Sequence, residues 1–419
     1  MHARWLVSVG IVVAVISPSA AGGAETVFSL EELRAFARAA HPTMESAEAA
    51  YTAATSMAAK ARVYPNPEIA LGVGRGRPRD GGDARSENTI DLVQPIEMPG
   101  IRRFRARSAG LRVRSAEIDR DLAGLLVDSS VSRLAYTVLL EQRRLVAARE
   151  IATIASRFHE LLARRVELGE SSPMEAIRAR TEWFSRRGDV VEAESSHSVA
   201  LATLNLFCGG RLPERYGVSA TLEGPGPVPL PADLVRRLHD RNPLLQRAGI
   251  AAEESKGAIT AARKEVFPRL DLVAGHETEL DRTAASVGVA FTIPLWNRNR
   301  HGVAVATAEH NRTTAESRTL EIELETALGQ AGAAYRRALA AIRLHEEGWT
   351  AAARESFQIA TFSFENGEAS LLEVLDAQRS YLGVKFKEAE SWAELALART
   401  EIEQLIAGPL ISETNDENR

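Results

Sequence analysis

Apolar and polar residues alternate in four short stretches of the chain, at about 67–75, 87–96, 268–277 and 285–294. Successive side chains of a β-strand point to opposite faces, so this period of two predicts four strands with one apolar face each. In the last stretch, small or polar residues separate the apolar ones: Val287, Val289, Phe291 and Ile293. Each stretch has about 10 residues, the length of a tilted strand that crosses a membrane.

Most of the remaining chain has a helical period. We expect helices at about 43–64, 101–168 and 172–207, and again at about 244–267, 300–366 and 370–406. The two longest segments contain almost no proline, and about 68 residues at 1.5 Å each make a rod of about 100 Å. Periodic segments of that length are typical of coiled coils, and their many alanines indicate helices that pack closely in a wall or tube.

The same order of elements occurs twice. His41–Pro42 matches Asn242–Pro243, 201 residues further on, and Pro67 matches Pro268 at the same shift. Matching landmarks in one order indicate an internal duplication. We therefore divide the chain into two repeats, at 29–214 and 232–407, a linker segment at 215–231 that ends in a Pro/Gly-rich stretch, and a polar tail at 408–419.

Each repeat has a corner where its second strand meets its long helix. The segments IDLVQPIEMPGIRR (90–103) and VGVAFTIPLWNRNR (287–300) share a layout of alternation, proline, turn and basic run. Proline has no N–H to donate, so the prolines are expected to stop the strand ladder, and Gly100 and Asn297 are expected to permit the sharp turn. The corner residues are Pro95, Pro99 and Gly100 in the first repeat and Pro294 and Asn297 in the second.

Each repeat also has a tight turn between its long helix and its last helix. The stretches LGESSPMEAIRA and NGEASLLEVLDA match at glycine, glutamate and serine positions. Glycine lets two helices turn back tightly on each other. The predicted tips consist of Leu168, Gly169, Glu170 and Ser172 in the first repeat and of Asn366, Gly367, Glu368 and Ser370 in the second.

The first residues have the layout of a secretory signal peptide, which we place at 1–24. His2 and Arg4 precede an apolar run at Leu6–Ile16, and small residues follow. The run is shorter than the about 20 residues of a spanning helix, and no other long apolar run follows, so no transmembrane helix is expected. The alternative for this run is a short buried helix.

Composition and cysteine usage narrow the class of protein. The formal net charge of −5 argues against a nucleic-acid partner. The single cysteine, Cys208, cannot build a disulfide framework or a zinc cluster, and we expect a small buried hydrophobe there. GVGRG at 72–76 does not lead into a helix, so it does not fit a dinucleotide-binding loop. The scattered histidines give no metal-ligand spacing, so neither a resident metal nor an enzyme is expected.

Alternation alone would also fit two soluble hairpins that cover a core. The signal peptide and the long rods favour membrane strands instead, because soluble hairpins do not need rods. Four strands cannot close a barrel, and an open edge is not tolerated in lipid. The strands must therefore be shared between subunits, and three subunits would supply twelve strands around a cyclic axis.

The duplicated order of helix, strand pair, long helix, tip and helix resembles the TolC family of outer-membrane efflux ducts over about residues 29–407. QPIEMPGIRR, with MPG before basic residues, is most similar to the CzcC/CusC-type branch, which serves heavy-metal efflux. The resemblance implies a mainly α chain with a membrane β-barrel, and a homotrimer with a twelve-stranded barrel on a long periplasmic α-helical barrel. It also implies an outer-membrane location, no cofactor, a periplasmic adaptor protein that docks at the tips, an inner-membrane RND-type pump and contact with outer-membrane lipid.

In that family, two acidic positions just past the second tip line the periplasmic entrance of the duct in its closed state. The resemblance implies that Glu373 and Asp376 occupy these positions here. They lie three residues apart, on one helix face, and threefold symmetry would make each a ring of carboxylates that attracts cations. The alternative is a pair of solvated surface acids. Where the family often has an arginine or polar residue near the tip, this chain has Ala369.

Two other functions stay open at this point. A periplasmic coiled-coil adaptor or structural protein would also contain long helices, although an adaptor would show one helical hairpin between β-rich halves. A TolC-like duct for drugs or secreted proteins would have the same architecture, because the pump selects the cargo.

Overall fold

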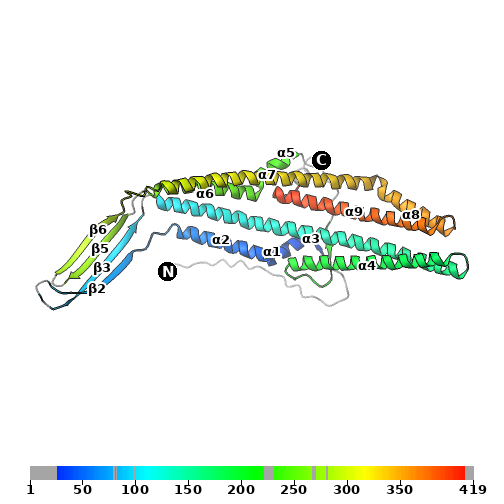
Figure 1. Cartoon of the computed structure of the whole chain (residues 1–419), viewed down its shortest axis with the longest axis horizontal. Coiled ribbons are helices and arrows are strands. Elements are labelled where there is room, and N and C mark those ends of the chain that lie inside the picture. The colour runs from blue at the N-terminus through cyan, green and yellow to red at the C-terminus, as the bar shows by residue number, and fades with distance from the viewer. Residues whose placement is uncertain are drawn as a thin grey trace, which may run out of the picture.

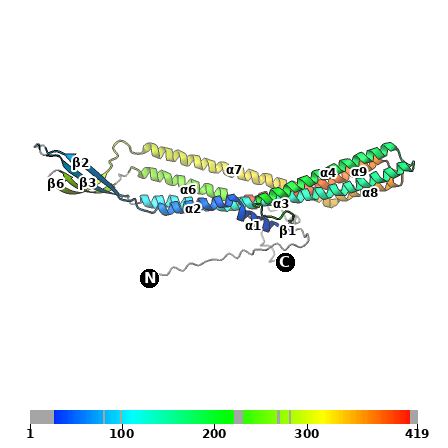
Figure 2. The ribbon, with the colours of Figure 1, turned by 90° about the horizontal axis from the view of Figure 1, so that it is seen from below.

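A rod of helices with a β-sheet at one end forms the molecule (Figure 1). The computed structural model describes residues 26–78, 81, 83–97, 100–220, 231–266, 270–279 and 282–410. The predicted signal peptide, Pro99, residues 221–230 of the linker and the tail from 411 lie outside these residues. Two helical hairpins turn at the end of the rod opposite the sheet, and the rod changes direction near its middle (Figure 2).

Both repeats contain two short helices, a strand pair and a long helical hairpin. The first consists of β1 (Thr26–Ser29), α1 (Leu30–Ala40), α2 (Pro42–Lys60), β2 (Glu68–Gly76), β3 (Arg85–Ile96), α3 (Ile101–Glu167), α4 (Pro173–Phe207) and β4 (Tyr216–Ser219). The second consists of α5 (Pro231–Arg241), α6 (Pro243–Lys264), β5 (Leu270–Glu279), β6 (Arg282–Phe291), α7 (Arg300–Leu344), η1 (His345–Trp349), α8 (Thr350–Glu365) and α9 (Leu371–Leu405).

The matched dipeptides His41–Pro42 and Asn242–Pro243 start the second helix of each repeat. The proline occupies the first turn, where no N–H partner is needed, and the residue before it caps the helix. Asn242 Oδ1 accepts from the backbone N–H of Leu244 at 2.9 Å, and its Nδ2 donates to the backbone oxygen of Leu405 at 2.8 Å. The same side chain therefore begins α6 and fixes it against the end of α9.

The strands form one antiparallel sheet in the order β2-β3-β5-β6 within the described residues. The register aligns Ile69, Leu92, Ala274 and Val287 in one row across it, and the next row consists of Ala70, Asp91, Gly275 and Ser286. One face is therefore apolar and the other small or polar. The apolar face is exposed, with large side chains from all four strands: Ile69, Leu71, Val73, Ile90, Leu92, Leu272, Val287, Val289 and Phe291.

A second, parallel sheet of β1 and β4 lies near the middle of the rod. These strands are not predictable from the sequence pattern, because four residues are too few to show alternation. Tyr216 is buried among residues of α1, α3 and α4, and its hydroxyl donates to the backbone oxygen of Leu201 at 2.6 Å. Burial raises the pKa of this hydroxyl to about 12. The sheet thus joins the beginning of the first repeat to its end.

Three apolar clusters hold the helices together. Two equivalent clusters lie near the middle of the rod, one in each repeat, and a third fills the space between the hairpins. Among the described helices, α3 is long and apolar enough to cross a membrane by length and composition, although no further transmembrane helix was expected. Of the apolar stretch that meets this test, 44% is buried. Val127, Val131 and Val138 of α3 pack in the core.

The two long helices differ by one irregular turn. α3 is continuous, whereas a π-helical turn, η1, separates α7 from α8, and Gly348 there has φ 126°. Val127 and Val131 occupy the core positions of Leu324 and Leu328, 197 residues later, whereas Gly169 and Gly367 at the tips are 198 apart. A π-turn is a one-residue insertion in an α-helix, so η1 accounts for the extra residue.

Candidate functional site at the tips and corners

The two tips have the same backbone geometry. Gly169 and Gly367 have φ 77° and 79°, the left-handed conformation that glycine adopts without steric cost. The next N–H in each, of Glu170 and Glu368, donates at 2.8 Å to the carbonyl five residues before it. This is a Schellman motif, which satisfies the last carbonyls of a helix. The repeated glycine thus closes the same turn in both hairpins.

Each tip continues into a capping box. Ser172 and Ser370 are the N-caps of α4 and α9, and the glutamates three residues later return a bond to the cap. Glu175 Oε2 accepts from the Ser172 N–H at 3.2 Å, and Glu373 Oε2 accepts from the Ser370 N–H at 2.9 Å. Hydrogen bonds from the Ser171 hydroxyl and then from the Ser172 N–H lower the pKa of Glu175. The S-x-x-E spacing of Ser172 with Glu175 and of Ser370 with Glu373 is the local signal for both caps in the sequence.

The two predicted gate acids are exposed, on the first turns of α9. They differ in one respect: the carboxylate of Glu373 takes part in its own helix cap, whereas Asp376 lies one turn further along. Leu168 is also exposed, with 67% of its surface accessible. The apolar side chain of Leu168 is therefore exposed at the first tip, and the carboxylate of Asp376 is exposed beside the second.

The corners differ in part from the sequence prediction. Gly100 is left-handed, with φ 97°, but in the second repeat the left-handed residue is Asn299 and not Asn297. Asn297 Oδ1 instead accepts from the Asn299 N–H at 3.0 Å. Both left-handed residues immediately precede a long helix, so the turn belongs to the helix start.

Proline does not end the strand ladder where the sequence analysis expected. Pro95 lies inside β3, opposite Asp271, and β3 continues to Ile96. In the second repeat β6 already ends at Phe291, before Pro294. Side chains hold the first corner: Arg105 Nε donates to the backbone oxygen of Ala61 at 2.9 Å, and Arg102 lies over the ring of Tyr64 at 4.2 Å.

One group of possible metal ligands was missed in the sequence. His239, Glu321 and Glu325 lie together, although 82 residues separate the histidine from the first glutamate. Their only local signal is the spacing of the two glutamates, one helical turn apart. Cys208 is buried, as expected, and burial raises the pKa of its thiol to about 11, which makes it unreactive.

The exposed apolar sheet at one end of a long helical rod is typical of one class of protein: a membrane protein with a helical extension. The sequence matches the family described as Outer membrane efflux protein over residues 33–210 and 234–408. The chain belongs to this family of outer-membrane efflux channels, which are conduits rather than enzymes and have a long periplasmic extension. The alternative of a periplasmic adaptor is thereby set aside.

Several relatives are named for metals. The cobalt-zinc-cadmium resistance protein CzcC of Cupriavidus metallidurans is 26% identical over 352 residues, which cover 83% of this chain and 82% of CzcC. The nickel-cobalt-cadmium resistance protein NccC of Alcaligenes xylosoxydans is 26% identical over 68% of this chain and 65% of its own length. These likenesses agree with the heavy-metal branch that the MPG corner suggested.

Solved structures share the fold. A structure of CusC has a TM-score of 0.79 at 18% identity and covers 93% of this chain and 96% of its own. The outer-membrane channel OprN has a TM-score of 0.79 at 17% identity, over 91% of this chain and 90% of its own. The TolC-like fold expected from the sequence is therefore confirmed.

Proposed function

We propose that three copies of this chain form the exit duct of a tripartite efflux system, which passes heavy-metal cations from the periplasm to the exterior. The observation that carries the trimer is the sheet: its outer strands, β2 and β6, are not hydrogen-bonded to each other within one chain. Lipid does not tolerate open edges, so neighbouring chains must pair them. Three four-stranded sheets give twelve strands, within the range of known barrels.

The apolar sheet face would contact the lipid of the outer membrane. Trp296 and Tyr64, at the periplasmic ends of the sheet, are 93% and 63% exposed. Aromatic side chains of this kind gather at the membrane–water boundary. The opposite face, with Asp91 and Ser286, would line a wet lumen.

The tips would form the periplasmic entrance and the docking surface for an adaptor protein. Both tips lie at the far end of the rod from the sheet (Figure 1), and both have the same exposed turn. An inner-membrane pump of the RND type would supply the energy through that adaptor. No covalent chemistry is required of the duct itself.

The metal cargo is supported by the relatives CzcC and NccC and by the acidic residues at the entrance. Rings of Asp376 and Glu373 would lower the energy of cations there and repel anions. Because the Glu373 carboxylate also caps α9, Asp376 is the better-placed selectivity residue. The mutual repulsion of three carboxylates would also favour opening.

The test is conductance of the purified protein in planar bilayers. We expect cation-selective channels, and we expect Asp376→Asn to lower the cation-to-anion permeability ratio. Glu401→Gln is the matched control, because Glu401 is an exposed acid on the same helix, far from the tip. If Asp376→Asn leaves the cation-to-anion permeability ratio unchanged, Asp376 does not line the entrance.

Metal tolerance of cells tests the cargo separately. Deletion of the gene for this protein should make cells more sensitive to cobalt, zinc or cadmium salts. Expression of the wild-type protein should restore growth in the presence of these salts. If deletion instead sensitises cells to drugs and leaves metal tolerance intact, the duct serves drug efflux.

A further inference from the structure

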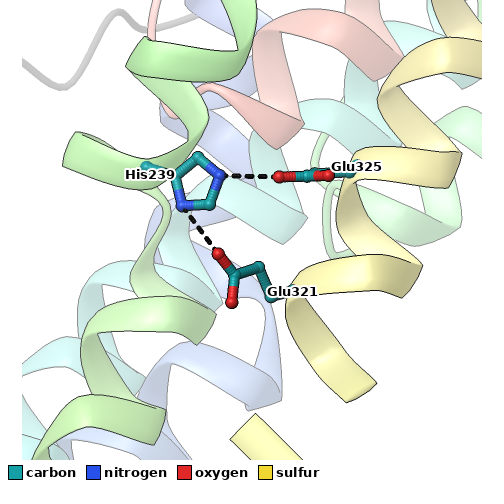
Figure 3. A group of neighbouring side chains, drawn as sticks. All are labelled: His239, Glu321 and Glu325. Atoms are coloured by element: carbon teal, nitrogen blue, oxygen red, sulfur yellow. Dashed lines mark hydrogen bonds and ion pairs between the residues drawn. The ribbon is translucent and has the colours of Figure 1, made fainter. Parts of the chain in front are cut away.

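A cluster of one imidazole and two carboxylates lies where α5 contacts α7 (Figure 3). His239 Nε2 lies 2.8 Å from Glu325 Oε1, and His239 Nδ1 lies 3.5 Å from Glu321 Oε1. The two glutamates are one turn apart on α7, so both point toward the histidine. One ligand atom from each of the three residues lies within 4.8 Å of the other two.

The first repeat shows what this position needs for packing alone. Arg38 on α1 lies 201 residues before His239 on α5, the shift that matches His41 to Asn242. Asp128 on α3 lies 197 residues before Glu325 on α7, the shift that matches the core residues Val127 and Leu324. The guanidinium binds the Asp128 carboxylate with two nitrogens, one of them at 2.7 Å. An arginine–aspartate pair thus joins the two helices in repeat one, and a guanidinium cannot bind a cation because it stays protonated.

The second repeat differs from the first at two neighbouring positions of this contact between helices. The arginine is replaced by histidine, whose neutral ring nitrogen is a common metal ligand. The residue that corresponds to Glu321 is Gly124, which has no side chain, so the second carboxylate is also specific to repeat two. A simple ion pair would need neither change, because repeat one fixes the same helices without them.

The surroundings favour a cation. His239 is in the last turn of α5, at the negative end of the helix dipole. Two carboxylates add two negative charges beside the imidazole. The three side chains are 35%, 46% and 44% exposed, so an ion can reach them from solvent and the ligands can adjust.

The donor set indicates the class of ion. Imidazole nitrogen with carboxylate oxygen suits zinc and related first-row divalent ions, whereas calcium and magnesium prefer oxygen alone. Ligand atoms around such an ion lie about 2.0–2.2 Å from the metal and hence about 3–3.5 Å apart. The 3.5 Å separation between His239 Nδ1 and Glu321 Oε1 already has this size. Glu325 faces the other ring nitrogen, Nε2, at 2.8 Å, where it would orient the imidazole toward the ion.

We propose that His239, Glu321 and Glu325 form a binding site for one divalent transition-metal ion per chain, completed by water. The ion would join α5 to α7 in the second repeat, as the Arg38–Asp128 pair joins α1 to α3 in the first. The site is on the periplasmic rod and is distinct from the entrance acids, which lie at the tips. It does not depend on which cargo the duct conducts.

The experiment measures Zn²⁺ binding to the full-length protein in detergent by calorimetry, after removal of metal with chelator. We expect one ion per chain, and at least roughly tenfold weaker binding in Glu321→Gln. Co²⁺ as a second probe should give a visible absorption band that His239→Arg abolishes. Mg²⁺ in millimolar excess should not displace Zn²⁺.

His239→Arg is the control that separates metal binding from packing. It recreates the arginine–carboxylate pair of repeat one, so we expect unchanged thermal stability without metal and no rise on adding Zn²⁺, whereas the wild type should become more stable. Equal Zn²⁺ stoichiometry and affinity in wild type and His239→Arg would overturn the site. Displacement by Mg²⁺ would overturn the assignment to transition metals.

Discussion

Arg165 Nη1 donates a 3.3 Å hydrogen bond to the backbone oxygen of Phe364. Its Nη2 donates to the backbone oxygen of Glu365 at 2.5 Å, and the guanidinium lies 5.5 Å from the centre of the Phe364 ring. These carbonyls end α8, where a cation is favoured by the helix dipole. One side chain of the first hairpin therefore caps a helix of the second and joins the two tips.

Arg165→Ala should loosen the second tip. Loss of two charge-assisted hydrogen bonds, partly exposed to solvent, should cost about 1 kcal/mol and raise amide exchange at 366–369 roughly 5- to 10-fold. Hydrogen exchange with mass spectrometry measures this. Arg164 is a neighbouring exposed residue, and Arg164→Ala should leave the exchange rates at 366–369 unchanged. Equal effects of the two substitutions would show that the hydrogen bonds of Arg165 do not specifically stabilise the second tip.

The cap of α4 should depend on pH. The folded-state pKa of Glu175 is lowered by its hydrogen bonds with Ser171 and Ser172, so its stabilisation is complete above the ordinary glutamate value of about 4.3. It is lost as the pH falls through the lowered folded value. We expect local exchange at the first tip, corrected for intrinsic rates, to rise below about pH 4, and Glu175→Gln to lose this dependence. An identical pH profile in that variant would contradict the assignment.

The π-turn should be sensitive to a side chain at its glycine. Gly348 has φ 126°, a conformation that L-residues rarely adopt, so Gly348→Ala should destabilise the protein by roughly 1–2 kcal/mol. Thermal unfolding in detergent measures the change. Gly329→Ala, in the regular part of α7, should instead stabilise by about 0.5–1 kcal/mol, because a Cβ there meets no atom within 4 Å. If both variants are equally destabilised, backbone conformation is not the cause.

The two faces of β6 should differ in their tolerance of charge. Val289→Arg puts a charge on the apolar face, which should cost about 2–4 kcal/mol in lipid. The adjacent Ala290→Arg points to the opposite face, toward water. We expect Val289→Arg to reduce the amount of assembled protein in outer membranes, measured by semi-native electrophoresis, and Ala290→Arg to be tolerated. The opposite result would show that the two faces of the sheet are assigned the wrong way round.

The strand pairs, long helices and tips could be predicted because each depends on a local pattern. Alternation in "SVGVAFTI" depends only on neighbours, and so do the glycine and serine of "NGEAS". The corner at Asn299 could not be distinguished from Asn297, because both asparagines tolerate a left-handed conformation. Tertiary hydrogen bonds favour Asn299: its Nδ2 donates to the backbone oxygen of Ala262 at 2.8 Å and to Glu265 Oε2 at 2.6 Å.

Features that depend on distant residues could not be found in the sequence. β1 and β4 pair across about 190 residues, and His239 meets Glu321 through the packing of α5 on α7. The only trace of the π-turn in the sequence is that the matched residues of the two repeats are 197 apart in the core and 198 apart at the tips. This difference can be seen only after the core positions are known. The fold was thus more predictable than the contacts that distinguish one repeat from the other.

The outer edges of β2 and β6 pair with no strand of the same chain among the described residues, so a single copy is an incomplete membrane protein. An isolated sheet with two open edges has no stable place in lipid, so insertion and assembly must occur together and will depend on how many copies are present. Defective copies that still pair would be incorporated beside intact ones. With the three copies per duct proposed above, a cell in which one third of the chains are defective would retain fewer than one third of its fully intact ducts.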